Sequence, residues 1–362
     1  MSKRARESGA GAASSGYPGA DNARAAKGVQ EQRRATRLTR EGPVNPDTKD
    51  FCGAFAALDL DNSWDLGAFR KGFSIEITSM SEELVTFDMV GIDPPLANAF
   101  RRILIAEVST VAISNVTIYQ NTGVIHDENL AHRLGLVPIK FEPELLKWRE
   151  PDAGFDEDSS VVFTLRVACE KERRSVYSGD LVWEPMSDAQ RERFKDDPPR
   201  PVDAGILLAK LGPGQEIECI CHCERGIGRS HAKWSPVCTA TYRLLPELQR
   251  DEDAADSDAP PARRDPKSDC CIFDLDPSAQ AGASRRSVAA GPRKCSAVRE
   301  GAGEAAGEVA RGLRVVKLKD HYLFSIEAVG QLPATVLFDR ALQRLKEKCK
   351  TAKSVLQTQK EE

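Results

Sequence analysis

The chain has 362 residues, 41% of them hydrophobic, which is enough to build the core of one or two globular domains. Its 51 basic and 55 acidic residues leave a formal net charge of -4, which excludes binding of nucleic acid or anionic membranes through overall charge. Without a signal peptide or a run of roughly 18 apolar residues, we expect a soluble intracellular protein whose ten cysteines are reduced thiols.

Two segments have compositions that disfavour a packed core. Residues 1–50 are rich in Gly, Ala, Ser and Arg, and residues from about 251 to 312 combine acidic, proline-rich and alanine-rich runs. We predict a disordered arm at 1–50, an extended lead-in at 51–72 and a mobile excursion at about 251–312. The N-terminal "SKRAR" suits either a nuclear import signal or plain solvated charge.

The first regular elements are a strand pair and a helix. "FSIEIT" and "LVTFDMV" alternate apolar and polar residues, as half-buried strands do. "DPPLANAFRRILIAEV" then changes to helical spacing after a predicted Asp93 cap. Its apolar stripe, which runs toward Glu107, consists of Leu96, Phe100, Ile103 and Leu104. The other flank of this helix carries Asn98, Arg101 and Arg102.

A strand, "TVAISNVTIYQNTG", precedes the polar stretch "HDENLAHRLG" at residues 126–135. His126 and His132 are six residues apart, about 240° around a helix, and therefore cannot share one metal ion. We predict a short helix with Asp127 as its cap, Leu130 and Leu134 buried, and Gly135 at its end.

Two further strands, "SVVFTLRVAC" and "EIECICHCE", raise the question of a metal site. In an extended strand Cys219, Cys221 and Cys223 face one side about 7 Å apart. Sulfurs that share a zinc ion each lie about 2.3 Å from it, and the chain has no C-x-x-C pair. Small buried thiols are the favoured interpretation, and a metal-binding cluster remains the alternative.

Other chemical signatures are sparse. "GIGRSHAKWSP" groups basic residues beside Trp234 and could contact a nucleic-acid backbone, although no stacking platform accompanies it. The sequence has no phosphate loop, no complete dinucleotide fingerprint and no nucleophile elbow. This pattern favours a binding or assembly role.

The C-terminal region returns to regular structure. "DHYLFSIEAVG" has the pattern of a strand, and a helix is predicted from about Thr335. Its apolar stripe consists of Phe338, Ala341, Leu342, Leu345 and Cys349.

Three long segments carry a resemblance to a known family: "FDMVGIDPPLANAFRRILIAEVSTVAISNVTIYQNTGVIHDENLAHRLGLVPI", "GQEIECICHCERGIGRSHAKWSPVCTATYRLLP" and "VKLKDHYLFSIEAVGQLPATVLFDRALQRLKEKC". They closely resemble the alpha-like assembly subunits of cellular RNA polymerases, in the form shared by polymerases I and III. The alternative is the third-subunit type of polymerase II or its archaeal counterpart. That type typically carries a cysteine-rich metal loop after R-L-G-L-x-P, and residues 137–163 contain no cysteine.

The resemblance implies an α+β fold. A two-part dimerisation domain is expected at 73–110 plus 315–362, with an inserted, mainly β domain at 111–314. The family implies a non-catalytic subunit without a cofactor that pairs with the smaller alpha-like subunit. The pair would form a platform for the two large catalytic subunits in the nucleus and nucleolus, and DNA would be contacted only indirectly.

The resemblance also suggests candidate contact residues. The predicted dimer interface consists of Leu96, Phe100, Ile103, Leu104, Phe338, Leu342 and Leu345. The predicted docking residues for a large subunit are Arg101, Arg102, His126, Asp127, Glu128, His132 and Arg133. A solvated helix flank is the rival interpretation for the two neighbouring arginines, as a helix cap is for Asp127.

Overall fold

A computed structural model of the chain describes residues 34–39, 42–44, 65–150, 153–250, 273–275, 287–289 and 313–361. These residues divide into two compact units. One holds the described parts of Met1–Ser63 and Leu245–Lys319, and the other holds those of Trp64–Leu244 and Asp320–Glu362. Most of the arm predicted at 1–50 and of the excursion predicted at 251–312 lies outside the described residues.

The first unit contains short antiparallel strands. Its members are β1 (Ala35–Thr39), β2 (Gly42–Val44), β14 (Phe273–Leu275) and β15 (Ser287–Ala289), together with parts of β13 (Val237–Arg250) and β16 (Leu313–Ala328). β1 pairs with β2 and β16, and β15 pairs with β14 and β13. Short strands therefore occur inside two segments whose composition indicated none.

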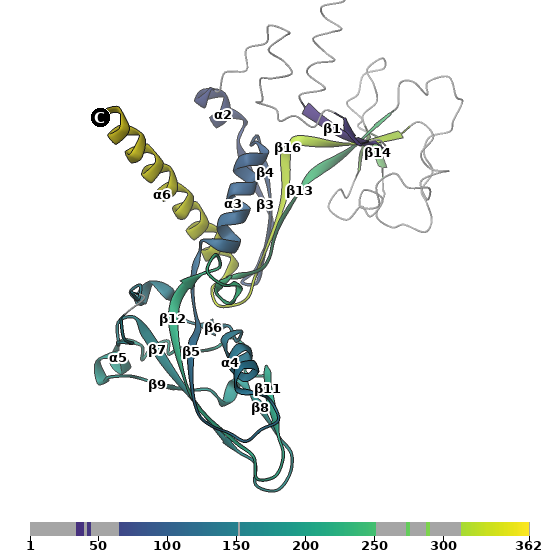
Figure 1. The fold of residues 1–362 in the computed structure, drawn as a ribbon. Helices are drawn as coiled ribbons and strands as arrows, with labels where there is room; N and C mark the ends of the chain where they lie inside the picture. The colour runs from purple at the N-terminus through teal and green to yellow at the C-terminus, as the bar shows by residue number, and fades with distance from the viewer. Residues whose placement is uncertain are drawn as a thin grey trace, which may run out of the picture. The chain divides into compact units, whose positions relative to one another are not determined.

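Four antiparallel strands and two long helices form one part of the second unit. The strands are β3 (Ser74–Met80), β4 (Leu84–Val90), the C-terminal part of β16 and the N-terminal part of β13, with β4 paired to β3 and β16, and β13 next to β16. Helices α3 (Pro94–Ala106) and α6 (Ala334–Glu361) contact each other, and α6 also contacts β4 (Figure 1). These elements confirm the strands and helices that periodicity predicted here.

The predicted extended lead-in is wrong at its described end, where Leu66–Gly72 forms helix α2. The Asp65 carboxylate caps this helix by accepting hydrogen bonds from the backbone N–H groups of Gly67 at 3.0 Å and Ala68 at 2.9 Å. These bonds lower the pKa of the Asp65 carboxyl. Phe69 and Phe73, at the end of α2, both pack against the hydrophobic core. This packing supports a helix that the short sequence did not predict.

An antiparallel four-stranded sheet of order β5-β12-β7-β9 forms the rest of the second unit. Its strands are β5 (Ser109–Asn121), β7 (Ser160–Ala168), β9 (Val182–Glu184) and β12 (Glu216–Ile227). Two small strand pairs accompany it: β6 (Ile139–Lys140) with β10 (Arg200–Pro201), and β8 (Arg174–Tyr177) with β11 (Leu207–Leu211). The helices are α4 (Asp127–Gly135) and α5 (Asp188–Arg193), and short 3-10 turns occur at Pro143–Leu145, Ser178–Asp180 and Ala232–Trp234.

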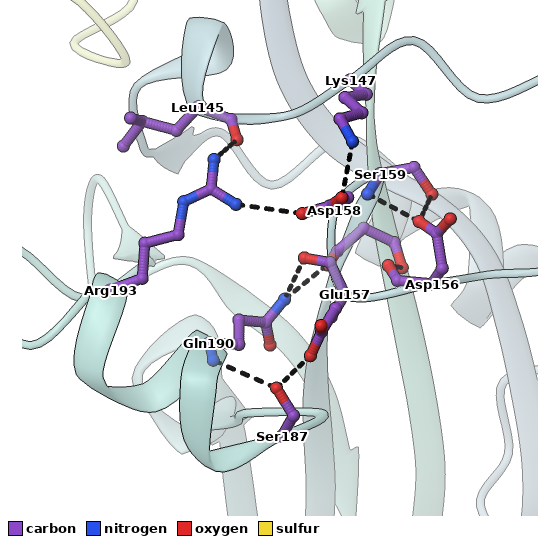
Figure 2. A network of polar contacts seen from close by, with 10 residues as sticks. Leu145, Lys147, Asp156, Glu157, Asp158, Ser159, Ser187, Gln190 and Arg193 are labelled. Carbon is purple, nitrogen blue, oxygen red and sulfur yellow. Dashed lines mark hydrogen bonds and ion pairs between the residues drawn. The ribbon is translucent and has the colours of Figure 1, made fainter.

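Figure 2 shows how α5 is held to the loop before β7. The buried Gln190 side chain donates from Nε2 to the backbone carbonyl oxygen of Glu157 at 3.0 Å. Asp158 in the same loop pairs with Lys147 at 2.7 Å and with Arg193 at 3.3 Å. Because each of these polar groups has a partner, the network fixes a loop that its acidic composition would leave in water.

The second unit has two separate hydrophobic cores. One lies among α3, α6, β4, β16 and the N-terminal part of β13, and the other lies beneath the β5-β12-β7-β9 sheet. The predicted α+β fold is confirmed, and the strand pairs that the structure describes are antiparallel. Among the described residues no helix combines the length and apolar character needed to cross a membrane.

Candidate interaction surfaces

The seven residues predicted as a dimer interface fall into two groups in the structure. Five belong to or pack against the chain's own core: Phe100, Ile103, Leu104, Phe338 and Leu345. The other two, Leu96 and Leu342, are 45% and 40% exposed. Leu96 and Leu342 therefore have apolar surface left for another chain, whereas the first group mainly holds the two helices in place.

Aromatic rings join α3 and α6 to the sheet. The ring centroids of Phe100 and Phe338 are 5.3 Å apart, and Phe338 meets Phe87 of β4 edge to face at 5.2 Å. Phe87 in turn stacks on Phe324 of β16 at 5.2 Å. Such pairs contribute beyond the area they bury, so both helices are fixed on one face of the sheet.

The same face of the sheet continues past the helices onto β3. Ile75, Ile77 and Met80 lie opposite Met89, Phe87 and Val85 of β4, which are core residues. Cross-strand partners point to the same side of a sheet. The three β3 side chains nevertheless remain 38%, 63% and 63% exposed. We call Ile75, Ile77 and Met80 the open β3 face, a feature that the sequence analysis did not identify although the alternation in "SIEITSM" contains it.

Glu107, placed at the end of the predicted α3 stripe, has a polar role. It is the C-cap residue of α3, and its carboxylate contacts Lys348 at 2.5 Å and Arg344 at 3.4 Å on α6. The pairs therefore link the end of one helix to the middle of the other.

The predicted cap of the "DENLAHRLG" helix is wrong by one residue. The helix begins at Asp127, and His126 occupies the N-cap position without a side-chain bond to the helix. The Asp127 carboxylate instead accepts a hydrogen bond from Nδ2 of Asn121 at 2.7 Å, and it also lies in the first turn, where the helix dipole favours negative charge. Leu130 and Leu134 are fully buried, as the sequence predicts.

The predicted docking residues on α4 have different surroundings. Glu128 and His132 are exposed, whereas the Arg133 guanidinium donates to the backbone carbonyl oxygens of Leu208 at 3.0 Å and Leu207 at 2.5 Å. The ring of His132 lies 6.5 Å from that of His231, which comes from a distant part of the chain. Arg133 therefore fastens α4 to β11, and Glu128 and His132 face solvent.

His132 and His231 line a pocket of about 220 Å³ between α4, β5 and the Ala232–Trp234 turn. Lys233 closes one side of it, with Nζ donating to the carbonyl oxygen of Ile113 at 3.0 Å. Burial lowers the pKa of this lysine. The pocket brings together residues that no short motif in the sequence connects.

The two predicted docking arginines lie on α3, a different helix. Arg101 is half-buried and donates from Nε and Nη2 to the Asn98 side-chain oxygen at 3.2 and 2.8 Å. Arg102 is exposed. The structure thus places one of the pair in a local hydrogen bond and leaves the other at the surface.

Cys219, Cys221 and Cys223 face one side of β12, as predicted, and all three are 0% exposed in the core of the four-stranded sheet. A hydrogen bond with Cys219 and burial raise the pKa of the Cys221 thiol, and burial raises the pKa of Cys223. In the part of the chain that the structure describes, no three His, Cys, Asp or Glu residues gather in a metal-binding arrangement. These thiols act as small apolar core residues.

The "GIGRSHAKWSP" segment forms a tight junction between β12 and the turn that follows. Trp234 is 8% exposed, and its indole lies so close to Gly226 that a Cβ there would come within 2.3 Å of the ring. Nζ of Lys233 lies 4.3 Å above the same ring. Trp234 is therefore unavailable to stack on a nucleic-acid base, which removes the aromatic support for that alternative.

An apolar sheet face that continues beyond its own helices is typical of a dimerisation module. Residues 86–349 match the family described as the RNA polymerase Rpb3/Rpb11 dimerisation domain. The chain belongs to this family of RNA polymerase subunits.

The curated relatives specify the type of subunit further. The DNA-directed RNA polymerases I and III subunit rpac1 of Dictyostelium discoideum is 38% identical over 331 residues, covering 89% of this chain and 92% of the relative. The human and Saccharomyces cerevisiae subunits RPAC1 are each 36% identical, and 96% of each is covered, with 90% and 87% of this chain. The polymerases II, IV and V subunit 3 of Arabidopsis thaliana is 31% identical and covers 78% of this chain. Identity and coverage therefore favour the polymerase I and III type over the polymerase II type.

Proposed function

We propose that this chain is a non-catalytic assembly subunit of DNA-directed RNA polymerases I and III. In this proposal it pairs with the smaller alpha-like subunit, and the pair forms the platform on which the two large catalytic subunits assemble for rRNA, tRNA and 5S RNA synthesis. The complex acts in the nucleus, including the nucleolus, and this chain meets DNA only through the complex. The match to RNA polymerase subunits supports a place within that enzyme complex.

The open β3 face is the observation that supports pairing most directly. Ile75, Ile77 and Met80 lie on the core side of the sheet and yet are exposed. Apolar surface on the core side of a sheet favours coverage by a partner, because burying it removes about 25 cal/mol of free energy per Å². The exposed Leu96 and Leu342 on the two neighbouring helices extend the apolar surface available to the partner.

The proposal assigns docking of a large subunit to polar groups on α3 and α4. Arg102, Glu128 and His132 are exposed and free to meet another chain, and guanidinium groups suit carboxylate partners. Arg133 and Asp127 contribute by fixing α4 through their bonds to β11 and to Asn121. A rigid helix presents docking residues with less loss of entropy than a mobile loop does.

The test is purification of the tagged full chain from its source, followed by identification of the associated chains. We expect the smaller alpha-like subunit and the large subunits of both polymerase I and polymerase III. Leu342→Asp should reduce recovery of all of them because it places a charge on the exposed apolar surface of α6. Gln343→Asp at the adjacent exposed position should not reduce recovery. Recovery of polymerase II subunits alone, or of no large subunit, contradicts the proposal.

A further inference from the structure

The pocket of about 220 Å³ beside α4 presents hydrogen-bond donors and no carboxylate. Its polar lining side chains are those of Ser114, His132, His231 and Lys233, and none of the described residues that line it is Asp or Glu. A molecule of liquid water occupies roughly 30 Å³, so the pocket has room for a small ligand. The lining favours a ligand that accepts hydrogen bonds.

The Lys233 ammonium is a partly desolvated positive charge on one side of this pocket. Its Nζ donates one hydrogen bond to the Ile113 carbonyl oxygen at 3.0 Å and lies 4.3 Å above the Trp234 ring, whereas an ammonium group has three N–H donors. Burial disfavours the charged form and lowers the pKa of this lysine. The carboxylate that acts on its charge, Glu224, is itself bonded to Arg149 at 2.6 Å. An anion in the pocket would therefore supply a counter-charge for Lys233.

The hydrogen bonding of His231 fixes which of its ring nitrogens can meet a ligand. Its Nδ1 accepts a hydrogen bond from the backbone N–H of Lys233 at 3.1 Å. A ring nitrogen that accepts carries no proton, so the neutral imidazole has its proton on Nε2 and donates from there. A metal ion needs a ring nitrogen with an available lone pair, which this arrangement does not offer. The Lys233 charge beside it also favours an anion over a cation.

His132 lies on the other side of the pocket, at the end of α4. Its ring centroid is 6.5 Å from that of His231. The carbonyl oxygens of His132 and Arg133, which would repel an anion at this helix end, both accept from the backbone N–H of Leu136 at 3.2 Å. Glu128, one turn earlier, is exposed and does not line the pocket. The surroundings of His132 are therefore compatible with a negative ligand.

We propose that this pocket binds a small oxyanion, a phosphate or a carboxylate, among His132, His231 and Lys233. Nε2 of His231 and Nζ of Lys233 donate to its oxygens, and His132 meets it from α4. The apolar lining residues Val116 and Leu136 accommodate a short carbon group attached to the anion. A bound anion ties the end of α4 to the turn at Ala232–Trp234, and this site does not depend on the proposed pairing of subunits.

The test uses the purified full chain labelled with ¹³C-histidine, whose five imidazoles are followed by NMR. Sodium phosphate and, separately, sodium acetate replace sodium chloride at constant ionic strength. We expect the resonances of His132 and His231 to shift saturably with at least one of the two anions. Those of His126, His222 and His321, which do not line the pocket, should not shift saturably.

Three variants identify the binding groups. Lys233→Met keeps the apolar stem and removes the charge, and it should weaken anion binding by about tenfold or more, because hydrogen bonds to charged groups are the strong ones. His132→Gln, at an exposed position, should weaken binding by roughly threefold or more. Lys210→Met removes the same charge from an exposed position outside the pocket and is the matched control, with affinity within about twofold of the wild type.

Each contrary result overturns the inference. It fails if neither anion shifts His132 and His231 in the wild type, or if the exposed His126 shifts with the same midpoint, which would show general attraction of anions. It also fails if Lys233→Met binds as tightly as the wild type. The resonances of His222 and His321 report whether that variant is folded. If it is not folded, unchanged affinity in His132→Gln is the result that overturns the site.

Discussion

Strands β7 and β3 both belong to antiparallel sheets and have opposite surroundings. In β7, seven of the nine residues Ser160–Ala168 are buried, because the strand lies between β12 and β9 with packed side chains on both faces. In β3, all seven residues Ser74–Met80 are exposed, although its isoleucines and Met80 point to the core side of its sheet. For the apolar residues of β3, the difference lies in what covers the strand, because they share the core side of their sheet with buried residues of β4.

This contrast separates a region that completes its own core from one that does not. The β5-β12-β7-β9 sheet buries Cys219, Cys221, Cys223 and Phe163 within the chain. The β3-β4-β16 sheet is covered by α3 and α6 up to β4, and the open β3 face lies beyond. In the proposed pairing, a partner chain provides the missing cover on the second sheet.

The largest expected effect comes from Phe163→Ala in the core of the β5-β12-β7-β9 sheet. The ring is 0% exposed, and its loss should lower the free energy of unfolding of the isolated chain by about 3–5 kcal/mol. Ile77→Ala on the open β3 face is the matched control and should change it by less than about 0.5–1 kcal/mol. Urea unfolding of the purified chain measures both. Equal losses would mean that the open β3 face is covered within the chain.

The next effect concerns pairing and not stability. The double variant Ile77→Ser and Met80→Ser should leave unfolding of the isolated chain nearly unchanged while weakening association with the smaller subunit by at least about tenfold. Glu76→Ser, on the opposite face of the same strand, is the control for association. Calorimetry measures the affinity of each variant for the smaller subunit. Unchanged affinity for the double variant would show that the partner binds elsewhere.

The smallest expected effect is a pH dependence of stability that comes from His222 in the β5-β12-β7-β9 sheet. His222 stacks on Phe155 at 4.3 Å between ring centroids, and burial lowers the pKa of its imidazole. The unfolded chain, with an ordinary histidine pKa of about 6.5, therefore takes up the proton first as the pH falls. Stability should decrease from about pH 6.5 downward until the folded histidine is also protonated, and it should not depend on this group at higher pH.

His222→Gln should reduce that slope, whereas the same change at the exposed His126 should not. Chemical denaturation at several pH values between about 5 and 8 measures the slope. An unchanged slope in His222→Gln would mean that other groups govern the acid sensitivity of the chain.

Local elements were predictable where one periodicity persisted over many residues. The alternation in "LVTFDMV" and the 3.6-residue stripe of the helix at Pro94–Ala106 each identify an element and its buried side. The short helix Leu66–Gly72 was missed because its seven residues carry no stripe, and its support comes from stacked phenylalanines that pack on a core formed later in the chain.

The candidate surfaces were predictable only in part. The sequence indicated that Phe100 and Phe338 lie on apolar stripes, but it could not indicate that each ring would be used mainly within the chain. It also contained no sign that His132 would meet His231 or that Arg133 would bind the carbonyl groups of β11. These contacts join positions far apart in the chain, where no spacing rule applies.

The amino-acid sequence by itself indicated the longer strands and helices and the face that each presents inward, because hydrophobic periodicity is a local property of the chain. The α+β class was implied by the resemblance of its long segments to a known family. Only the tertiary structure decided which of those faces are covered. Burial depends on what packs across from a residue, and this separated the enclosed Phe163 from the uncovered Ile77 although both are apolar residues of strands.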